Sequence, residues 1–106
     1  MTAASYALRV VTDDAPVVVA VTGELDVTNV SEFAVSMEDV PAARPVVLDL
    51  SELGYLDSAG LATLDRLTGT NIAVVVIPRS SPLFRAAELM DLPRHDSLEE
   101  AISAAK

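Results

Sequence analysis

The sequence contains no cysteine, no tryptophan and a single histidine, His95. Without a thiol, the chain cannot form a disulfide, a thiolate zinc site or a cysteine nucleophile. One histidine also leaves few ligands for a metal ion. We therefore expect neither a bound metal nor a cofactor.

Basic residues are scarce as well. Lys and Arg together number 7 against 16 Asp and Glu, which gives a formal net charge of −9. Affinity for nucleic acids comes largely from Lys and Arg side chains that displace counterions from phosphates, so no DNA or RNA partner is expected. An acidic surface instead suits a basic patch on a partner protein, because complementary charge raises the rate of association.

Long hydrophobic runs are missing too. Hydrophobic residues make up 51% of the chain and the mean hydropathy is +0.41, but no run approaches the roughly 18 apolar residues of a membrane span. No basic segment followed by an apolar run marks a secretory signal. We expect a cytoplasmic protein that does not insert into a membrane. A length of 106 residues suits a single domain, 1–106, with one core and one main site.

The first third of the chain predicts a β-hairpin followed by a helix. Two β-branched runs, about 6–12 and 16–22, flank the turn-forming letters DDAP. Apolar residues then recur at steps of three and four over about 28–39, which indicates an amphipathic helix with Thr28 or Asn29 as its cap. The apolar positions of that pattern are Val27, Val30, Phe33, Ala34 and Met37.

The middle of the chain predicts a strand–helix–strand unit. The runs RPVVLDL (44–50) and NIAVVVIP (strand 72–77) are typical of strands buried in a parallel sheet. Leu61, Leu64 and Leu67 form a helical stripe between them.

The remaining residues predict two helices. The first covers 81–92 with Ser81 as cap and Pro82 in its first turn, and its stripe of Phe84, Leu89 and Met90 predicts core. A short edge strand around 94–96 and a last helix capped by Asp96 or Ser97 follow. The predicted fold class is α/β, with a mixed sheet and helices packed largely on one face.

The junction between strand 44–50 and the following helix holds Ser58, flanked by Asp57, Ala59 and Gly60. In open α/β sheets, functional residues gather outside the carboxyl ends of parallel strands. Ser58 alone fits an ordinary N-cap. Gly60 fits a need for close approach or for special backbone geometry, and it fits close helix-to-sheet packing as well. Asp57 fits a competing cap, an acid that orients the hydroxyl, or a ligand for a metal-bound nucleotide, and spacing does not choose among these roles.

The sequence does not show the motifs that usually accompany a catalytic serine at a position such as Ser58. A serine hydrolase needs a base and an oxyanion hole, and the chain has only His95 and no G-x-S-x-G motif. Neither a G-x-G-x-x-G motif nor a P-loop lysine motif occurs, so a nucleotide-binding fold is not indicated. We expect a binding protein rather than an enzyme.

Two segments resemble the signature segments of the STAS domain. They are GELD at 23–26 and LDLSELGYLDSAGLATL at 48–64, with LFRAAELMDL and SLEEAI extending the likeness. The family includes bacterial anti-sigma factor antagonists and the cytoplasmic tails of sulfate transporters. The resemblance implies the STAS fold across nearly the whole chain.

For the antagonists, the resemblance implies that Ser58 is phosphorylated by the anti-sigma factor itself, a serine kinase. The unphosphorylated form captures this kinase and frees the sigma factor, and a PP2C-type phosphatase restores that form. Asp57 is the adjacent acid, and Asp26 is expected near Ser58 across the strand ends. Many antagonists carry a second serine where this chain has Ala59.

We therefore expect an anti-sigma factor antagonist that works by partner switching and regulates transcription. Its predicted partner-binding residues are Glu24, Asp26, Thr28, Asn29, Asp57, Ser58, Ala59 and Gly60. Thr28 and Asn29 fit helix caps equally well. The alternative function is an accessory subunit of an ABC-type lipid transport complex, in which Ser58 need not be phosphorylated.

Overall fold

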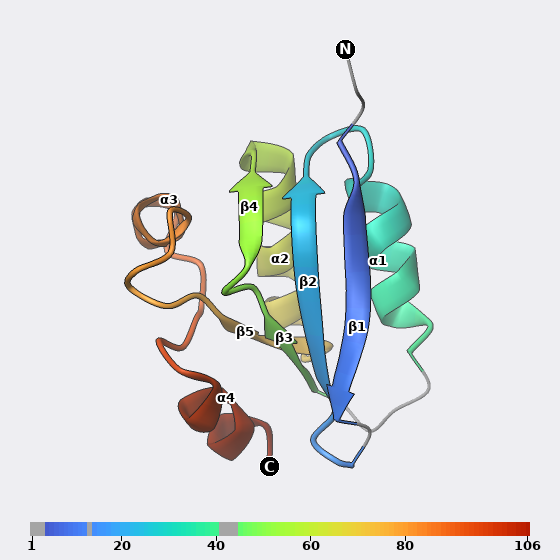
Figure 1. Ribbon diagram of the computed structural model, residues 1–106, viewed down its shortest axis with the longest axis vertical. Helices are drawn as coiled ribbons and strands as arrows, with labels where there is room; N and C mark the ends of the chain where they lie inside the picture. The colour runs from blue at the N-terminus through green and yellow to red at the C-terminus, as the bar shows by residue number, and fades with distance from the viewer. Residues whose placement is uncertain (1–3, 13, 41–44) are drawn as a thin grey trace.

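The β-hairpin predicted for the start of the chain forms one side of the sheet in the computed structural model, which describes residues 4–12, 14–40 and 45–106 (Figure 1). The strands are β1 (Tyr6–Thr12), β2 (Val18–Leu25), β3 (Val46–Asp49), β4 (Leu53–Leu56) and β5 (Ala73–Val76). The helices are α1 (Val30–Glu38), α2 (Ser58–Gly69), α3 (Phe84–Leu89) and α4 (Leu98–Ala105). Residue 13 of the predicted turn and residue 44 of the predicted strand lie outside the described residues.

The sheet is mixed, as predicted. β1 runs antiparallel to β2, whereas β3 and β4 both run parallel to β2, one after the other along its length. β5 runs parallel to β3, so the strand order is β1-β2-β3-β5 with β4 paired to β2. The carboxyl ends of β2 and β4 therefore lie side by side, where Leu25 is in register with Leu56.

β4 was not predicted as a separate strand. The chain turns after β3 because the Ser51 amide donates to the Asp49 carboxylate at 3.0 Å and the Leu53 amide donates to the Leu50 carbonyl at 3.1 Å. β4 then resumes the pairing with β2. The sequence had been interpreted as strand, loop and helix, so the strand that leads directly into α2 is a correction.

The main core lies between the sheet and helices α1 and α2, which cover the same face of the sheet (Figure 1). Fully buried side chains from both helices, Phe33 and Met37 in α1 and Leu64 and Leu67 in α2, fill it. α4 covers part of the opposite face, where Ala101 packs in a smaller buried cluster with strand valines. The predicted fold class is confirmed. No helix within the described ranges is long and apolar enough to cross a membrane.

Several predicted boundaries need correction. The first helix begins at Val30 rather than 28, and Val27 lies in the preceding turn with 71% of its surface exposed. The helix predicted from 81 begins at Phe84, because the Ser81 hydroxyl accepts from the Leu83 amide and holds a turn there.

The end of the chain follows the prediction more closely. The edge strand predicted near 94–96 is present as a single parallel bridge between His95 and Val76. The Ser97 hydroxyl caps α4 by accepting from the Glu100 amide at 3.2 Å.

Candidate functional site

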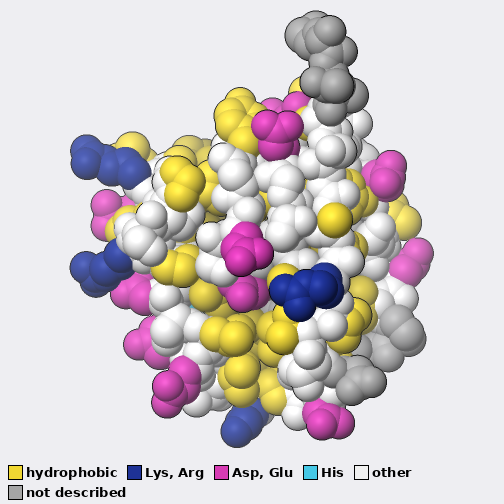
Figure 2. Space-filling view, viewed as in Figure 1, with side chains coloured by type: hydrophobic (Ala, Val, Ile, Leu, Met, Phe, Trp, Pro, Cys, Tyr) yellow, Lys and Arg dark blue, Asp and Glu magenta, His cyan; other side chains and the backbone are white. Residues whose placement is uncertain are grey.

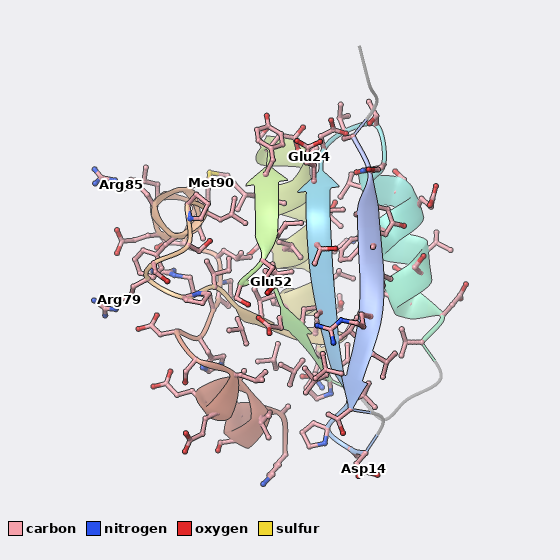
Figure 3. The ribbon with its side chains drawn as sticks, viewed as in Figure 1. Asp14, Glu24, Glu52, Arg79, Arg85 and Met90 are labelled. Atoms are coloured by element: carbon pink, nitrogen blue, oxygen red, sulfur yellow. The ribbon has the colours of Figure 1, made fainter. Side chains whose placement is uncertain are left out.

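The carboxyl ends of β2 and β4 place the two signature segments next to each other. β2 leads into the loop before α1, and β4 leads directly into α2. The Asp57 amide donates to the Leu25 carbonyl at 3.3 Å, which joins the two strand ends. Figure 3 labels Glu24 at this end of the sheet.

Ser58 is the first residue of α2, and its side chain is exposed. Its hydroxyl has no hydrogen-bond partner among the described residues. The N-cap is Asp57, whose Oδ1 accepts from the Gly60 amide at 2.9 Å. The interpretation of Ser58 as the helix cap is therefore wrong, and its hydroxyl is free to react or to contact another protein.

Both carboxylate oxygens of Asp57 accept hydrogen bonds from backbone amides. While Oδ1 caps α2, Oδ2 accepts from the Val27 amide at 3.0 Å. One side chain thus ties the loop between β2 and α1 to the first turn of α2. Of the roles left open for Asp57, the structure selects the cap, and it adds a link between loops that spacing could not reveal.

The loop between β2 and α1 is closed by its own polar side chains. Asp26 Oδ1 accepts from the Thr28 amide at 2.8 Å and also from the Thr28 hydroxyl. Asn29 Oδ1 accepts from the Asp26 amide at 3.0 Å, and Asn29 Nδ2 donates to the Glu24 carbonyl at 2.9 Å. Asn29 occupies the N-cap position of α1 without a capping side-chain bond. Neither Thr28 nor Asn29 therefore caps α1 through its side chain, and both shape the loop instead.

Gly60 lies on the buried side of α2. A Cβ atom built there would come within 2.3 Å of Leu56 Cδ1 and 3.4 Å of the Leu25 carbonyl oxygen. Glycine is therefore needed for close packing of α2 against the strand ends. Ala59 is half-buried and packs against the main core. Two of the eight predicted partner-binding residues, Ala59 and Gly60, thus contribute to packing.

The residues that face solvent here include two apolar side chains that sequence reasoning missed. Val27 forms the tip of the loop, and Tyr55 is 50% exposed at the β4 position in register with Glu24. Val27 had been assigned to the helical stripe, and β4 was not recognised as a strand. Burial in β4 does not alternate, because Gly54 and Tyr55 are both exposed between buried Leu53 and Leu56, so the sequence gives only a weak signal for an exposed Tyr55.

The charge at this end of the molecule is acidic. Glu24, Asp26 and Asp57 carry carboxylates, and none of them forms an ion pair within the described ranges. In those ranges, no group of three or more His, Asp or Glu side chains is placed to hold a metal ion. A hollow of about 550 Å³ lies elsewhere, at the start of α4, where His95 and Ser97 line it. The Ser58 region is thus an exposed acidic surface with apolar side chains, which suits a protein partner.

Comparisons with known proteins agree with this arrangement. The family model described as "Mlab, STAS domain" matches residues 8–92, which include both signature segments. The fold is also similar to the crystal structure of an anti-sigma factor antagonist from Mycobacterium paratuberculosis, with a TM-score of 0.71 and 26% sequence identity. That match covers 94% of this chain and 93% of the other.

Proposed function

The chain belongs to the STAS domain family, and we propose that it is an anti-sigma factor antagonist controlled by phosphorylation of Ser58. In the unphosphorylated form it binds an anti-sigma factor serine kinase and so frees the sigma factor. A PP2C-type phosphatase restores that form after phosphorylation. The observation that carries the proposal is the exposed Ser58 hydroxyl, which has no partner in the described part of the chain although it lies at the start of a helix.

The local geometry supports a phosphate at this position. A phosphoserine carries about −1.5 to −2 charge at pH 7. At the first residue of α2 this charge lies near unpaired amides and the positive end of the helix dipole, so the helix tolerates it. Because Asp57 already caps α2, the Ser58 side chain is not required for the fold. Phosphorylation therefore changes the surface and leaves the core intact.

The same surface explains how the phosphate prevents binding. Unmodified Ser58 lies beside Asp57 and the loop that contains Asp26. These carboxylates suit a basic patch on the kinase, and exposed Val27 and Tyr55 supply apolar contact area. A phosphate adds bulk and a strongly bound hydration shell at the centre of this surface, so the kinase can no longer pack closely against it. The kinase then dissociates.

The direct test uses the purified protein and a purified anti-sigma factor kinase from the same organism. Incubation with ATP is expected to add the mass of one phosphate to the wild type and none to Ser58→Ala. Ser103→Ala, an exposed serine on α4, is the matched control and should be phosphorylated like the wild type.

Binding provides the second measurement. In calorimetry, wild type and Ser58→Ala should bind the kinase equally well, and Ser58→Glu should bind at least about tenfold more weakly, a loss of about 1.4 kcal/mol. Phosphate on another residue, or no binding by the wild type, would contradict the proposal. Failure of both measurements would favour the lipid-transport alternative.

A further inference from the structure

The end of α3 exposes two large apolar side chains where the sequence predicted core. Leu89 is 73% exposed and Met90 is 56% exposed, so that prediction is wrong for both. Figure 3 shows Met90 on the side of α3 that lies toward β4, and the space-filling view shows apolar atoms in that region (Figure 2). Neighbouring exposed apolar side chains are typical of a contact surface.

The helix holds these side chains in a fixed position. Leu83, Ala87 and Leu92 are buried in the main core and anchor α3 at both ends. The Met90 amide donates to the Ala86 carbonyl at 3.0 Å, and Asp91 adopts a φ of 54°, which ends the helix. The exposed pair is therefore presented by a rigid helix end, which lowers the entropy lost when a partner binds.

Charge around α3 points to the chemistry of the partner. Arg79 pairs with Asp96 at 2.9 Å, and Arg94 lies 3.9 Å from the Glu88 carboxylate. Arg85 has no ion pair with any described residue. It precedes Leu89 by four residues, so both lie on one face of the helix. A carboxylate beside an apolar pocket on the partner would complement this face.

We propose that Arg85, Leu89 and Met90, called the α3 surface below, form a second contact area for the anti-sigma factor that binds around Ser58. This inference rests on the proposed function. α3 shares the main buried cluster with Leu53 and Leu56 of β4, and it lies beyond the free edge of that strand (Figure 1). β4, which carries the exposed Tyr55, lies between α3 and β2 (Figure 1).

The electrostatic balance supports the same partner. Residues 78–96 contain three arginines and three acidic residues, although the whole chain carries a net charge of −9. The segment that carries the α3 surface is thus formally neutral, so an acidic group of the partner meets little repulsion there. A kinase whose basic patch faces Asp26 and Asp57 can place a carboxylate against Arg85.

The test measures binding of the purified anti-sigma factor to variants of the α3 surface. The double substitution Leu89→Ser and Met90→Ser, and separately Arg85→Glu, are each expected to raise Kd by about tenfold or more. Arg85→Lys keeps the charge and should bind more tightly than Arg85→Glu. Val10→Ser is the matched control, because Val10 is 59% exposed on β1 and outside the proposed surface.

A second readout separates contact from a structural effect. When the α3 variants are the substrates of the kinase, phosphorylation of Ser58 at saturating variant concentration should keep the wild-type kcat, while KM rises. Unfolding midpoints in urea should stay near the wild-type value, because the substituted side chains are exposed. A drop in kcat together with a lower midpoint would refute the contact role.

The outcomes also separate this inference from the proposed function. If wild-type protein does not bind the anti-sigma factor, the proposed function fails and the inference fails with it. If wild type binds, Ser58→Glu does not, and the α3 variants bind like the wild type, only the α3 inference fails. If sedimentation shows that wild type forms a dimer and the α3 variants are monomers, the surface binds a second copy of this chain instead.

Discussion

Replacing Asp57 with Ala should destabilise the protein far more than replacing Ser58 with Ala, although the two residues are adjacent. Asp57 caps α2 through the Gly60 amide and holds the Val27 amide with its other oxygen. Loss of an N-cap side chain costs about 1 kcal/mol. Loss of the bond to the Val27 amide costs about another 1 kcal/mol, less than the roughly 1.5–3 kcal/mol typical of bonds to charged groups, because Val27 is exposed and water replaces the bond. The expected loss for Asp57→Ala is therefore about 2 kcal/mol.

Ser58→Ala removes a hydroxyl that has no partner within the described ranges, so its free energy of unfolding should change by less than about 0.5 kcal/mol. Urea unfolding followed by circular dichroism measures both variants. With an m-value of about 2 kcal/mol per molar urea, Asp57→Ala should shift the midpoint down by about 1 M. A loss for Ser58→Ala as large as that for Asp57→Ala would refute the assignment of Asp57 as the cap.

Asp57→Asn provides a finer test of the double role. An asparagine has one acceptor oxygen, so it can hold the Gly60 amide or the Val27 amide but not both. Its stability should fall between wild type and Asp57→Ala. Amide hydrogen exchange of Val27 should be faster in Asp57→Ala than in wild type, because the bond from that amide is lost. An unchanged exchange rate would show that Asp57 does not hold the loop in solution.

Three other predictions concern the fold. Gly60→Ala should lower the free energy of unfolding by about 1–3 kcal/mol, because the added Cβ meets Leu56. In Gly69→Ala, in the same helix, the added Cβ meets nothing within 4 Å, so the free energy of unfolding should rise by up to about 1 kcal/mol. Urea unfolding of both variants tests this difference. Burial raises the pKa of Tyr6 above 10.0. The stability that this shift contributes is therefore complete below pH 10 and is lost as the pH rises through the folded-state pKa. Tyr6→Phe should remove that part of the pH dependence of the urea midpoint. Ser97→Ala should cost about 1 kcal/mol in thermal unfolding, because it removes the cap of α4, and no loss would contradict that assignment.

Hydrophobic periodicity predicted most of the fold. The strong patterns in β1, β2, β3 and β5 and in the helices were sufficient for the mixed sheet and the element order. β4 was not predicted, because it is short and contains Gly54, so the alternation of buried and exposed residues along it is weak. Leu89 and Met90 follow a helical stripe that predicts core, but Leu83, Ala87 and Leu92 are the residues buried in this region, and Leu89 and Met90 are exposed. Periodicity groups residues on one face of a helix, but it does not show which face packs against the core.

The sequence predicted which residues lie in the candidate site, but it did not predict the hydrogen bonds that join them. The resemblance to the STAS domain implied that Asp26 lies near Ser58 across the strand ends, and the structure places both segments there. That Asp57, rather than Ser58, caps α2 depends on backbone angles at one residue. That the other oxygen of Asp57 reaches Val27, 30 residues away in the chain, depends on the pairing of β2 with β4. Neither detail leaves a pattern in the sequence.

The position of the charges has a consequence for experiments at different ionic strengths. Within the described ranges no charged side chain is buried, so the excess of acidic groups lies at the surface and repels itself. Salt at 0.15 M screens such repulsion beyond about 8 Å, and the free energy of unfolding should therefore rise as salt is added. The same screening weakens attraction between the acidic Ser58 region and a basic partner. Stability and affinity should thus change in opposite directions along one salt titration.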